Sequence, residues 1–204
     1  MIDSLLQSST FLFVLLNPFL MSIYLIDLIQ ELDFKIFANY LIRGTTISGF
    51  VFILFAWFGE SIFTQVLQVE FESFMVFGGI IFLILAIRFF FGGSQALGQL
   101  RGQPKDIAIT IAMPYMIGPG TISASVLAGS RLSPPLSAVT IAFTLSMTAL
   151  SILFFKWLHD YVKQRDEALI ERYIDIAGRT TAMILGTFSI DMILQGIETW
   201  IKEF

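Results

Sequence analysis

Long apolar stretches separated by short polar ones dominate the hydrophobic pattern of this chain. A helix needs about 20 mostly apolar residues to cross a bilayer, and six stretches reach or approach that length. They run from about Leu5 to Ile29, Ile36 to Gly59, Phe71 to Phe91, Ile107 to Ser130, Pro135 to Trp157 and Ile176 to Ile201. The pattern therefore predicts an all-α integral membrane protein with six transmembrane helices, in a single domain over residues 1–204.

Prolines and glycines interrupt two of the predicted spans. The first span carries Asn17 and Pro18, and the fourth carries Pro114, Gly118, Pro119 and Gly120. A proline removes one backbone donor and clashes with the carbonyl four residues earlier. In lipid the freed backbone groups survive only where protein or a watery cavity satisfies them. We therefore predict that the first and fourth helices are broken.

The interruptions occupy corresponding places in the two halves of the chain. A shift of 101 residues places Asn17-Pro18 over Gly118-Pro119, and a shift of 100 places Phe77–Ala86 over Ala177–Gly186. Three spans per half would give the halves opposite orientations in the membrane. We predict two inverted three-helix repeats, residues 1–100 and 101–204. Broken helices at corresponding positions of such repeats point to a transporter's binding site at the bilayer midplane.

Composition supports the membrane assignment and limits the chemistry. The chain is 56% hydrophobic and 14% charged, with a mean hydropathy of +0.81, whereas soluble domains carry about 25% charged residues. Its net charge of −4 gives no indication of a nucleic-acid partner. With no cysteine and one histidine, we expect no metal site and no catalytic group. No cofactor is expected beyond H⁺ or Na⁺ as a coupling ion.

Other functional classes find less support in the residues. An intramembrane enzyme needs a metal cluster or paired carboxylates, and direct use of ATP needs a phosphate-binding loop; the sequence has neither. A channel needs a polar stripe along a pore, which we do not find. A carrier of other small or apolar molecules and a membrane-embedded subunit that transports nothing both stay open.

The distribution of basic residues predicts the orientation in the membrane. With six spans, ten of the 12 Lys and Arg residues fall on one face. They are Lys35, Arg43, Arg88, Arg101, Lys105, Lys156, Lys163, Arg165, Arg172 and Arg179. The other face receives only Arg131 and Lys202. Cytoplasmic loops carry the excess of positive charge, so we predict both termini outside the cytoplasm, in a plasma (inner) membrane.

The second interruption has the features of an anion site. Thr121 is an acceptable N-cap for a restarted helix, which would leave the N–H groups of Ile122 and Ser123 free for a carboxylate. Asn17 would supply a side-chain amide from the other half. The alternative is that the prolines only shape packing, since Pro and Gly are frequent in membrane helices. The candidate substrate-binding residues are Asn17, Pro18, Pro114, Gly118, Pro119, Gly120, Thr121, Ile122 and Ser123.

Asp191 is the candidate for ion coupling. Uncharged residues flank it from Thr180 to Ile197, and an ionisable group at membrane depth is a functional hypothesis by default. It would bind H⁺ or Na⁺, or pair with a substrate ammonium group. The alternative is a position near the outer interface, because Trp200 follows nine residues later.

Several stretches together resemble the MarC family, which includes the SnatA transporters of small neutral amino acids. The stretches are Leu16-Asn17-Pro18, Gly78-Gly79-Ile80, Leu85-Ala86-Ile87-Arg88, Ala112-Met113-Pro114, Gly118-Pro119-Gly120 and Asp191–Ile197. The resemblance implies six spans and the carriage or export of amino acids such as alanine, glycine and serine. Two departures bear on substrate size and ion coupling. Phe19 and Leu20 stand where the family usually has a small residue, and Asp191 stands where it usually has Gln.

Small residues at a spacing of four recur in the predicted spans. Gly178, Ala182 and Gly186 form one such series. Small residues at this spacing let helices approach closely. The spacing leaves open whether the contact lies within one chain or in a homo-oligomer.

Overall fold

The structure is a computed structural model that describes residues 2–92, 107–163 and 167–202. Every regular element in those ranges is helical, which confirms the all-α prediction there. In chain order the elements are α1 (Ile2–Leu16), α2 (Pro18–Tyr24), α3 (Ile26–Glu31), α4 (Phe34–Ser61), the π-helix η1 (Ile62–Leu67), α5 (Phe71–Gly92), α7 (Ile107–Thr110), the π-helix η2 (Ile111–Met116), α8 (Pro119–Arg131), α9 (Pro134–Lys163) and α10 (Glu167–Lys202).

Four segments of the described chain are long and apolar enough to cross a membrane. They are Asp3–Tyr24, Phe34–Gly59, Phe71–Gly92 and Pro134–Val162, and they match the first, second, third and fifth predicted spans. The fourth predicted span is divided among α7, η2 and α8, of which the longest has 13 residues. α10 has 36 residues but is not among the four. The arrangement of six spans in two inverted repeats therefore stays a prediction.

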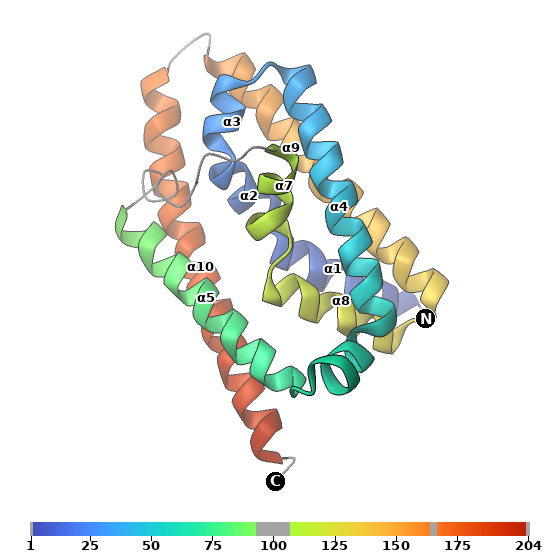
Figure 1. The fold of residues 1–204 in the computed structure, drawn as a ribbon. Helices are drawn as coiled ribbons and strands as arrows, with labels where there is room; N and C mark the ends of the chain where they lie inside the picture. Colours follow the sequence, from blue (N-terminus) through green and yellow to red (C-terminus); the bar gives the residue numbers. More distant parts are fainter. Residues whose placement is uncertain (1, 93–106, 164–166, 203–204) are drawn as a thin grey trace.

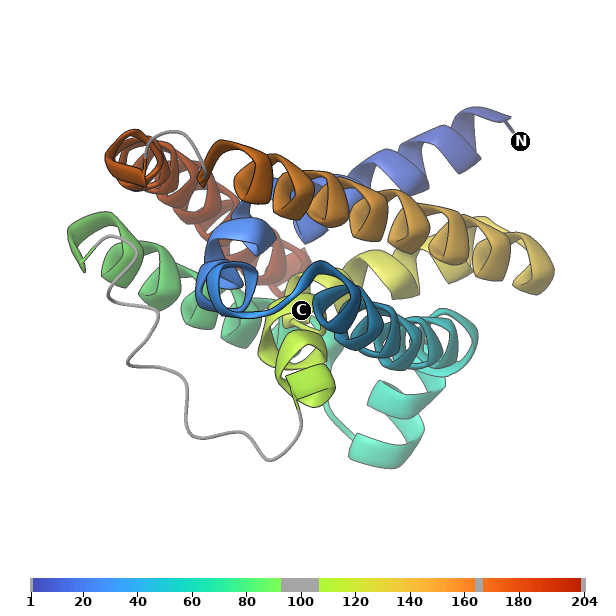
Figure 2. The same cartoon turned by 90° about the horizontal axis from the view of Figure 1, so that it is seen from above.

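Two long helix pairs enclose the shorter segments (Figures 1 and 2). α5 packs along α10, and α4 packs along α9. Between these pairs, α2 contacts both α9 and α10, while α8 contacts both α4 and α5. The segments that follow the two proline interruptions thus each touch at least one helix of each long pair.

The main buried cluster lies where α1, α2, α4, η2, α8 and α9 meet. Its largest fully buried side chains include Leu12, Met21, Phe37, Phe52 and Met116. A second, smaller cluster joins α2 to α10 through Leu20, Ile23, Tyr24 and Ala182. Lipid tails are as apolar as these side chains, so close van der Waals packing rather than transfer out of water stabilises such contacts in a bilayer.

Buried hydroxyl groups on α9 are satisfied by their own helix. Thr140, Thr144 and Thr148 are each at most 3% exposed. Their hydroxyls donate to the carbonyl four residues earlier over 2.8, 2.9 and 2.9 Å. A buried hydroxyl without a partner would cost free energy, and these local bonds let three polar residues lie inside an apolar protein.

A buried ammonium group fixes one end of the molecule. Lys156 is 2% exposed, and its Nζ donates to the carbonyl of Ile29 over 2.7 Å and to Oδ1 of Asp160 over 2.6 Å. Ile29 lies in the last turn of α3, where helix carbonyls lack partners within the helix. Lys156 therefore ties α9 to the end of α3.

The predicted six-span topology can be tested by labelling single cysteines from one side of the membrane. The chain contains no native cysteine, so each introduced cysteine reports on its own position. Asp33, Gln68 and Ser133 are exposed and lie between long helices, and Figure 1 places the α3–α4 turn at the opposite end of the molecule from η1. With six spans, Gln68→Cys and Ser133→Cys should react with a membrane-impermeant maleimide on intact cells. Asp33→Cys should react only after permeabilisation.

This labelling pattern depends on the segment from α7 to α8 crossing the membrane. If that segment does not cross, only α5 separates positions 68 and 133. The two cysteines would then react from opposite sides, which would contradict the six-span arrangement.

Candidate functional site

The first interruption is centred on Asn17. This residue adopts the left-handed conformation, with φ 40° and ψ 78°, and Pro18 disfavours right-handed helical backbone at the residue before it. Asparagine tolerates this conformation better than most residues. Its Oδ1 accepts a hydrogen bond from the N–H of Leu20 over 3.1 Å. Asn17 is thus the N-cap of α2, and Pro18 occupies the first helical position, where a missing N–H costs least.

In the second interruption too, the residue before each of two prolines is not helical. Met113, before Pro114, is extended with φ −123° and ψ 129°, and Gly118, before Pro119, is extended with φ −131° and ψ 166°. Between them the chain forms a wide turn, in which the N–H of Ile117 donates to the carbonyl of Ala112 over 2.8 Å. Pro114 lies within η2, and its side chain is outside the described part of the chain.

Thr121 connects the two sides of the second interruption. It is 2% exposed, and its Oγ1 accepts from the N–H of Gly118 over 3.0 Å. The same hydroxyl lies 2.7 Å from the carbonyl oxygen of Met116 and 2.9 Å from that of Gly118, and it donates its single proton to these acceptors. The hydroxyl therefore satisfies a donor and an acceptor that the prolines leave without helical partners.

The predicted start of the restarted helix was wrong by three residues. Gly118, not Thr121, is the N-cap of α8, because Pro119 is fit to occupy the first helical position. The N–H of Ile122 is consequently bonded to the carbonyl of Gly118 over 2.9 Å and is not free. Ser123 is in the second turn, where its hydroxyl donates to the carbonyl of Pro119 over 2.8 Å. The donors of the first turn are the N–H groups of Gly120 and Thr121.

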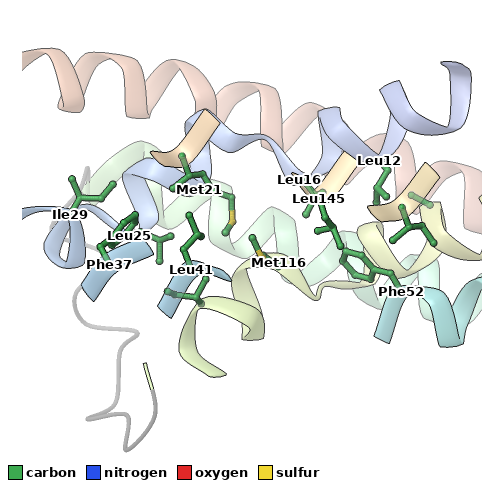
Figure 3. Close-up of a cluster of buried hydrophobic side chains, with 14 of the residues drawn as sticks. Leu12, Leu16, Met21, Leu25, Ile29, Phe37, Leu41, Phe52, Met116 and Leu145 are labelled. Carbon is green, nitrogen blue, oxygen red and sulfur yellow. The ribbon is translucent and has the colours of Figure 1, made fainter. Parts of the chain in front are cut away.

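The two interruptions meet in one buried cluster. Leu16 and Met21, which flank the first interruption, belong to the same cluster as Met116, which ends η2 (Figure 3). Met116 is fully buried, and its Sδ lies 3.4 Å from the hydroxyl of Ser48 on α4. The structure therefore brings Leu16 and Met116, which are 100 residues apart in the chain, into one buried cluster.

The long pair α5–α10 covers the start of α8. A Cβ atom added to Gly78 of α5 would lie 2.0 Å from Cβ of Pro119. One added to Gly120 would lie 2.9 Å from the ring of Phe82 and 3.3 Å from Sδ of Met192. Both glycines are buried, so their lack of a side chain permits the close approach. The first turn of α8 is therefore closed off on this side by α5 and α10.

Phe19 occupies the position where the resemblance leads one to expect a small residue. Its ring meets that of Phe155 on α9 edge to face, with centroids 5.8 Å apart. Like Leu85 and Leu185, it packs against the small cluster that joins α2 to α10. The first turn of α2 is thus bulky and apolar, in contrast to the Gly120 turn of α8.

Asp191 lies on the exposed side of α10. Its Oδ2 accepts from Nε2 of Gln195 over 2.7 Å, while the next residue, Met192, is the one that faces α8. The structure does not bring the carboxylate to the interruptions, and its role in ion coupling stays a prediction. Among the described residues no group of three or more His, Cys, Asp and Glu side chains could hold a metal ion.

Sequence reasoning missed the polar contacts that surround the interruptions. Ser48 and Lys156 were not candidates, although a serine beside Gly44 and Gly49 and a lone lysine after an apolar run are visible in the sequence. What the sequence could not supply is their partners, Met116 and Ile29, which lie 68 and 127 residues away.

Thr121→Val should destabilise the protein by about 1–3 kcal/mol, because the buried N–H of Gly118 would lose its acceptor. Thr121→Ser keeps the hydroxyl and should restore most of the loss. Ser123→Ala is the matched control, since that hydroxyl bonds only within its own helix. Thermal unfolding in detergent measures all three, and equal melting temperatures for Thr121→Val and Ser123→Ala would contradict the bridging role.

Gly78→Ala should lower the free energy of unfolding by about 1–3 kcal/mol, because the new methyl group collides with Pro119. Gly186→Ala is the control in the paired helix α10, where the nearest atom, Cβ of Ala86, would be at an ordinary 3.6 Å. Both changes gain the same helix propensity. An unchanged melting temperature for Gly78→Ala would show that α5 does not pack tightly against Pro119.

Comparison with known proteins gives a consistent result over nearly the whole chain. Residues 2–201 match the MarC family of integral membrane proteins. A UPF0056 membrane protein of Buchnera aphidicola subsp. Schizaphis graminum is 23% identical over 207 residues, which cover 98% of this chain and 100% of that protein. A second UPF0056 membrane protein, from Buchnera aphidicola subsp. Acyrthosiphon pisum, is 22% identical over 182 residues, 86% of this chain and 87% of its own. No solved structure matches the chain. The chain belongs to the MarC family of integral membrane proteins.

Proposed function

We propose that this protein is a secondary transporter of small neutral amino acids, such as alanine, glycine and serine, working by alternating access in the plasma (inner) membrane. The single observation that carries the proposal is the meeting of two interrupted segments, at Asn17-Pro18 and Gly118-Pro119, around one buried cluster. Interrupted helices at corresponding positions of two halves are typical of transporters that bind their substrate near the bilayer midplane.

The polar groups near the interruptions suit the two charged ends of an amino acid. The N–H groups of Gly120 and Thr121 begin the 13-residue helix α8, where the positive end of the helix dipole favours a carboxylate. Oδ1 of Asn17 is engaged with Leu20, which leaves the NH₂ group of that amide to contact the substrate.

Apolar neighbours limit the size and charge of the side chain that fits. Met116 and Phe82 lie beside α8, and Phe19 fills the equivalent turn of α2. A small uncharged side chain is accommodated there with the least displacement of packed atoms. This supports alanine, glycine and serine over larger or charged amino acids.

The two long helix pairs supply the moving parts of the proposed cycle. α2 and α8 each contact at least one helix of each pair, so rocking of the α5–α10 pair against the α4–α9 pair would open the interruptions to one side and then to the other. In inverted repeats such rigid-body rocking around a fixed site is the common form of alternating access. The excess of Lys and Arg on one predicted face supports termini outside the cytoplasm.

Counterflow tests the proposal directly. Purified protein in liposomes preloaded with unlabelled alanine should accumulate labelled alanine, in competition with glycine and serine but not with leucine. Accumulation should saturate and should be absent from empty liposomes, because a carrier exchanges substrate through an occupied site. A channel would equilibrate the label without counterflow, and absence of accumulation with folded protein would count against this substrate class.

The same assay with and without Na⁺ and a pH gradient tests Asp191. If this carboxylate binds the coupling ion, Asp191→Asn should abolish the ion dependence while leaving exchange intact. Gln195→Ala is the matched control, because it removes the partner of Asp191 but keeps the carboxylate. If the ion dependence survives Asp191→Asn, this carboxylate does not bind the coupling ion, and the interpretation of Asp191 as a residue near the outer interface is favoured.

A further inference from the structure

A groove opens between α1, α8 and α10. It is an open surface groove with a volume of about 650 Å³. Its floor and walls are mainly apolar and include Leu6, Phe11, Val14 and Leu127, which are between 36% and 61% exposed. In a membrane protein such open apolar surface faces lipid.

The groove has the form of a wedge because α10 and α8 diverge. They lie close together near the start of α8, where Sδ of Met192 would be 3.3 Å from a Cβ on Gly120. Arg131, at the far end of α8, lines the groove together with Gln195 of α10. The eleven residues from Gly120 to Arg131 correspond to about 16 Å of helix. The wedge is therefore long enough to lie along part of an extended chain.

Polar side chains also line this wedge. Gln7 and Thr10 of α1 and Gln195 of α10 line the groove with Arg131. Nε2 of Gln195 already donates to Asp191, but the amide carries a second N–H. The groove thus combines a guanidinium, amide donors and a hydroxyl with a long apolar surface, which is the amphipathic pattern of an anionic lipid.

The charge of Arg131 is not neutralised by the described part of the protein. The other basic residue predicted for the same face, Lys202, pairs with Glu198 over 2.6 Å, whereas Arg131 makes no ion pair with any residue of the described ranges. Arg131 stands in the last turn of α8, where the helix dipole favours a cation. Guanidinium groups bind phosphate through two parallel hydrogen bonds.

We infer that this groove binds an anionic phospholipid of the outer leaflet. The phosphate pairs with the guanidinium of Arg131, and one acyl chain lies along Phe11, Val14 and Leu127. A lipid rather than a soluble anion fits because most of the surface is apolar and opens toward the bilayer. The inference does not depend on what the protein transports.

Native mass spectrometry of the full chain in detergent tests the inference. The probes are phosphatidylglycerol and phosphatidylcholine with the same acyl chains, and sn-glycerol 3-phosphate as the headgroup without chains. Wild-type protein should retain phosphatidylglycerol in preference to phosphatidylcholine. Arg131→Gln should weaken phosphatidylglycerol binding about five-fold, Arg131→Lys should keep most of it, and Lys202→Gln is the matched control and should change nothing.

Leu127→Trp tests the place of the acyl chain without altering charge. The larger ring should fill the wedge and lower the affinity for both phospholipids, while circular dichroism and melting confirm the fold. Equal binding of both phospholipids by the wild type, or an equal effect of Arg131→Gln and Lys202→Gln, would overturn the inference. So would displacement of phosphatidylglycerol by glycerol phosphate, since that would indicate a site for a free anion, or unchanged binding by Leu127→Trp.

Discussion

Proline's effect on the residue before it is the constraint on which this structure depends. Asn17, Met113 and Gly118 all precede a proline, and all three are non-helical. Each interruption frees backbone groups that a bilayer cannot hydrate. The protein satisfies them with one short polar side chain per interruption, Asn17 or Thr121. The positions of the helices, their close approach at glycines and the buried cluster at Met116 all follow from where these interruptions fall.

The two interruptions each contain one of the two hydrogen bonds of a capping box. In a capping box the N-cap side chain accepts from the N–H three residues later, and the later side chain accepts from the N-cap N–H. Asn17 makes the first of these bonds to Leu20, and Thr121 makes the second to Gly118. The two N-caps differ in backbone as well as in side chain, since Asn17 is left-handed and Gly118 is extended. The turn at Phe19 is bulky, whereas the lack of a side chain at Gly120 lets α5 and α10 pack closely against the other turn.

The sequence was sufficient for features that depend on neighbouring residues. The helical class, four of the spans and the places of both interruptions follow from apolar runs and from Pro and Gly, which act locally. The N-cap at Thr121 was misassigned because the hydroxyl suggested a cap, whereas the fixed φ of Pro119 decides where the helix begins. Contacts such as Ser48 with Met116 depend on residues 68 positions apart, and local patterns carry no information about them. The exposed position of Asp191 likewise depends on which side of α10 meets α8.

The bond from Lys156 to Ile29 has a consequence for how the chain is made. α3 has six residues, fewer than an isolated helix needs to be stable, and its final turn is held by a side chain 127 residues further along the chain. Synthesis proceeds from the N-terminus, so residues 26–31 leave the ribosome well before their partner exists. The end of α3 therefore lacks this hydrogen bond until α9 has been synthesised and inserted. Completion of the early half of this protein is thereby coupled to the arrival of the later half.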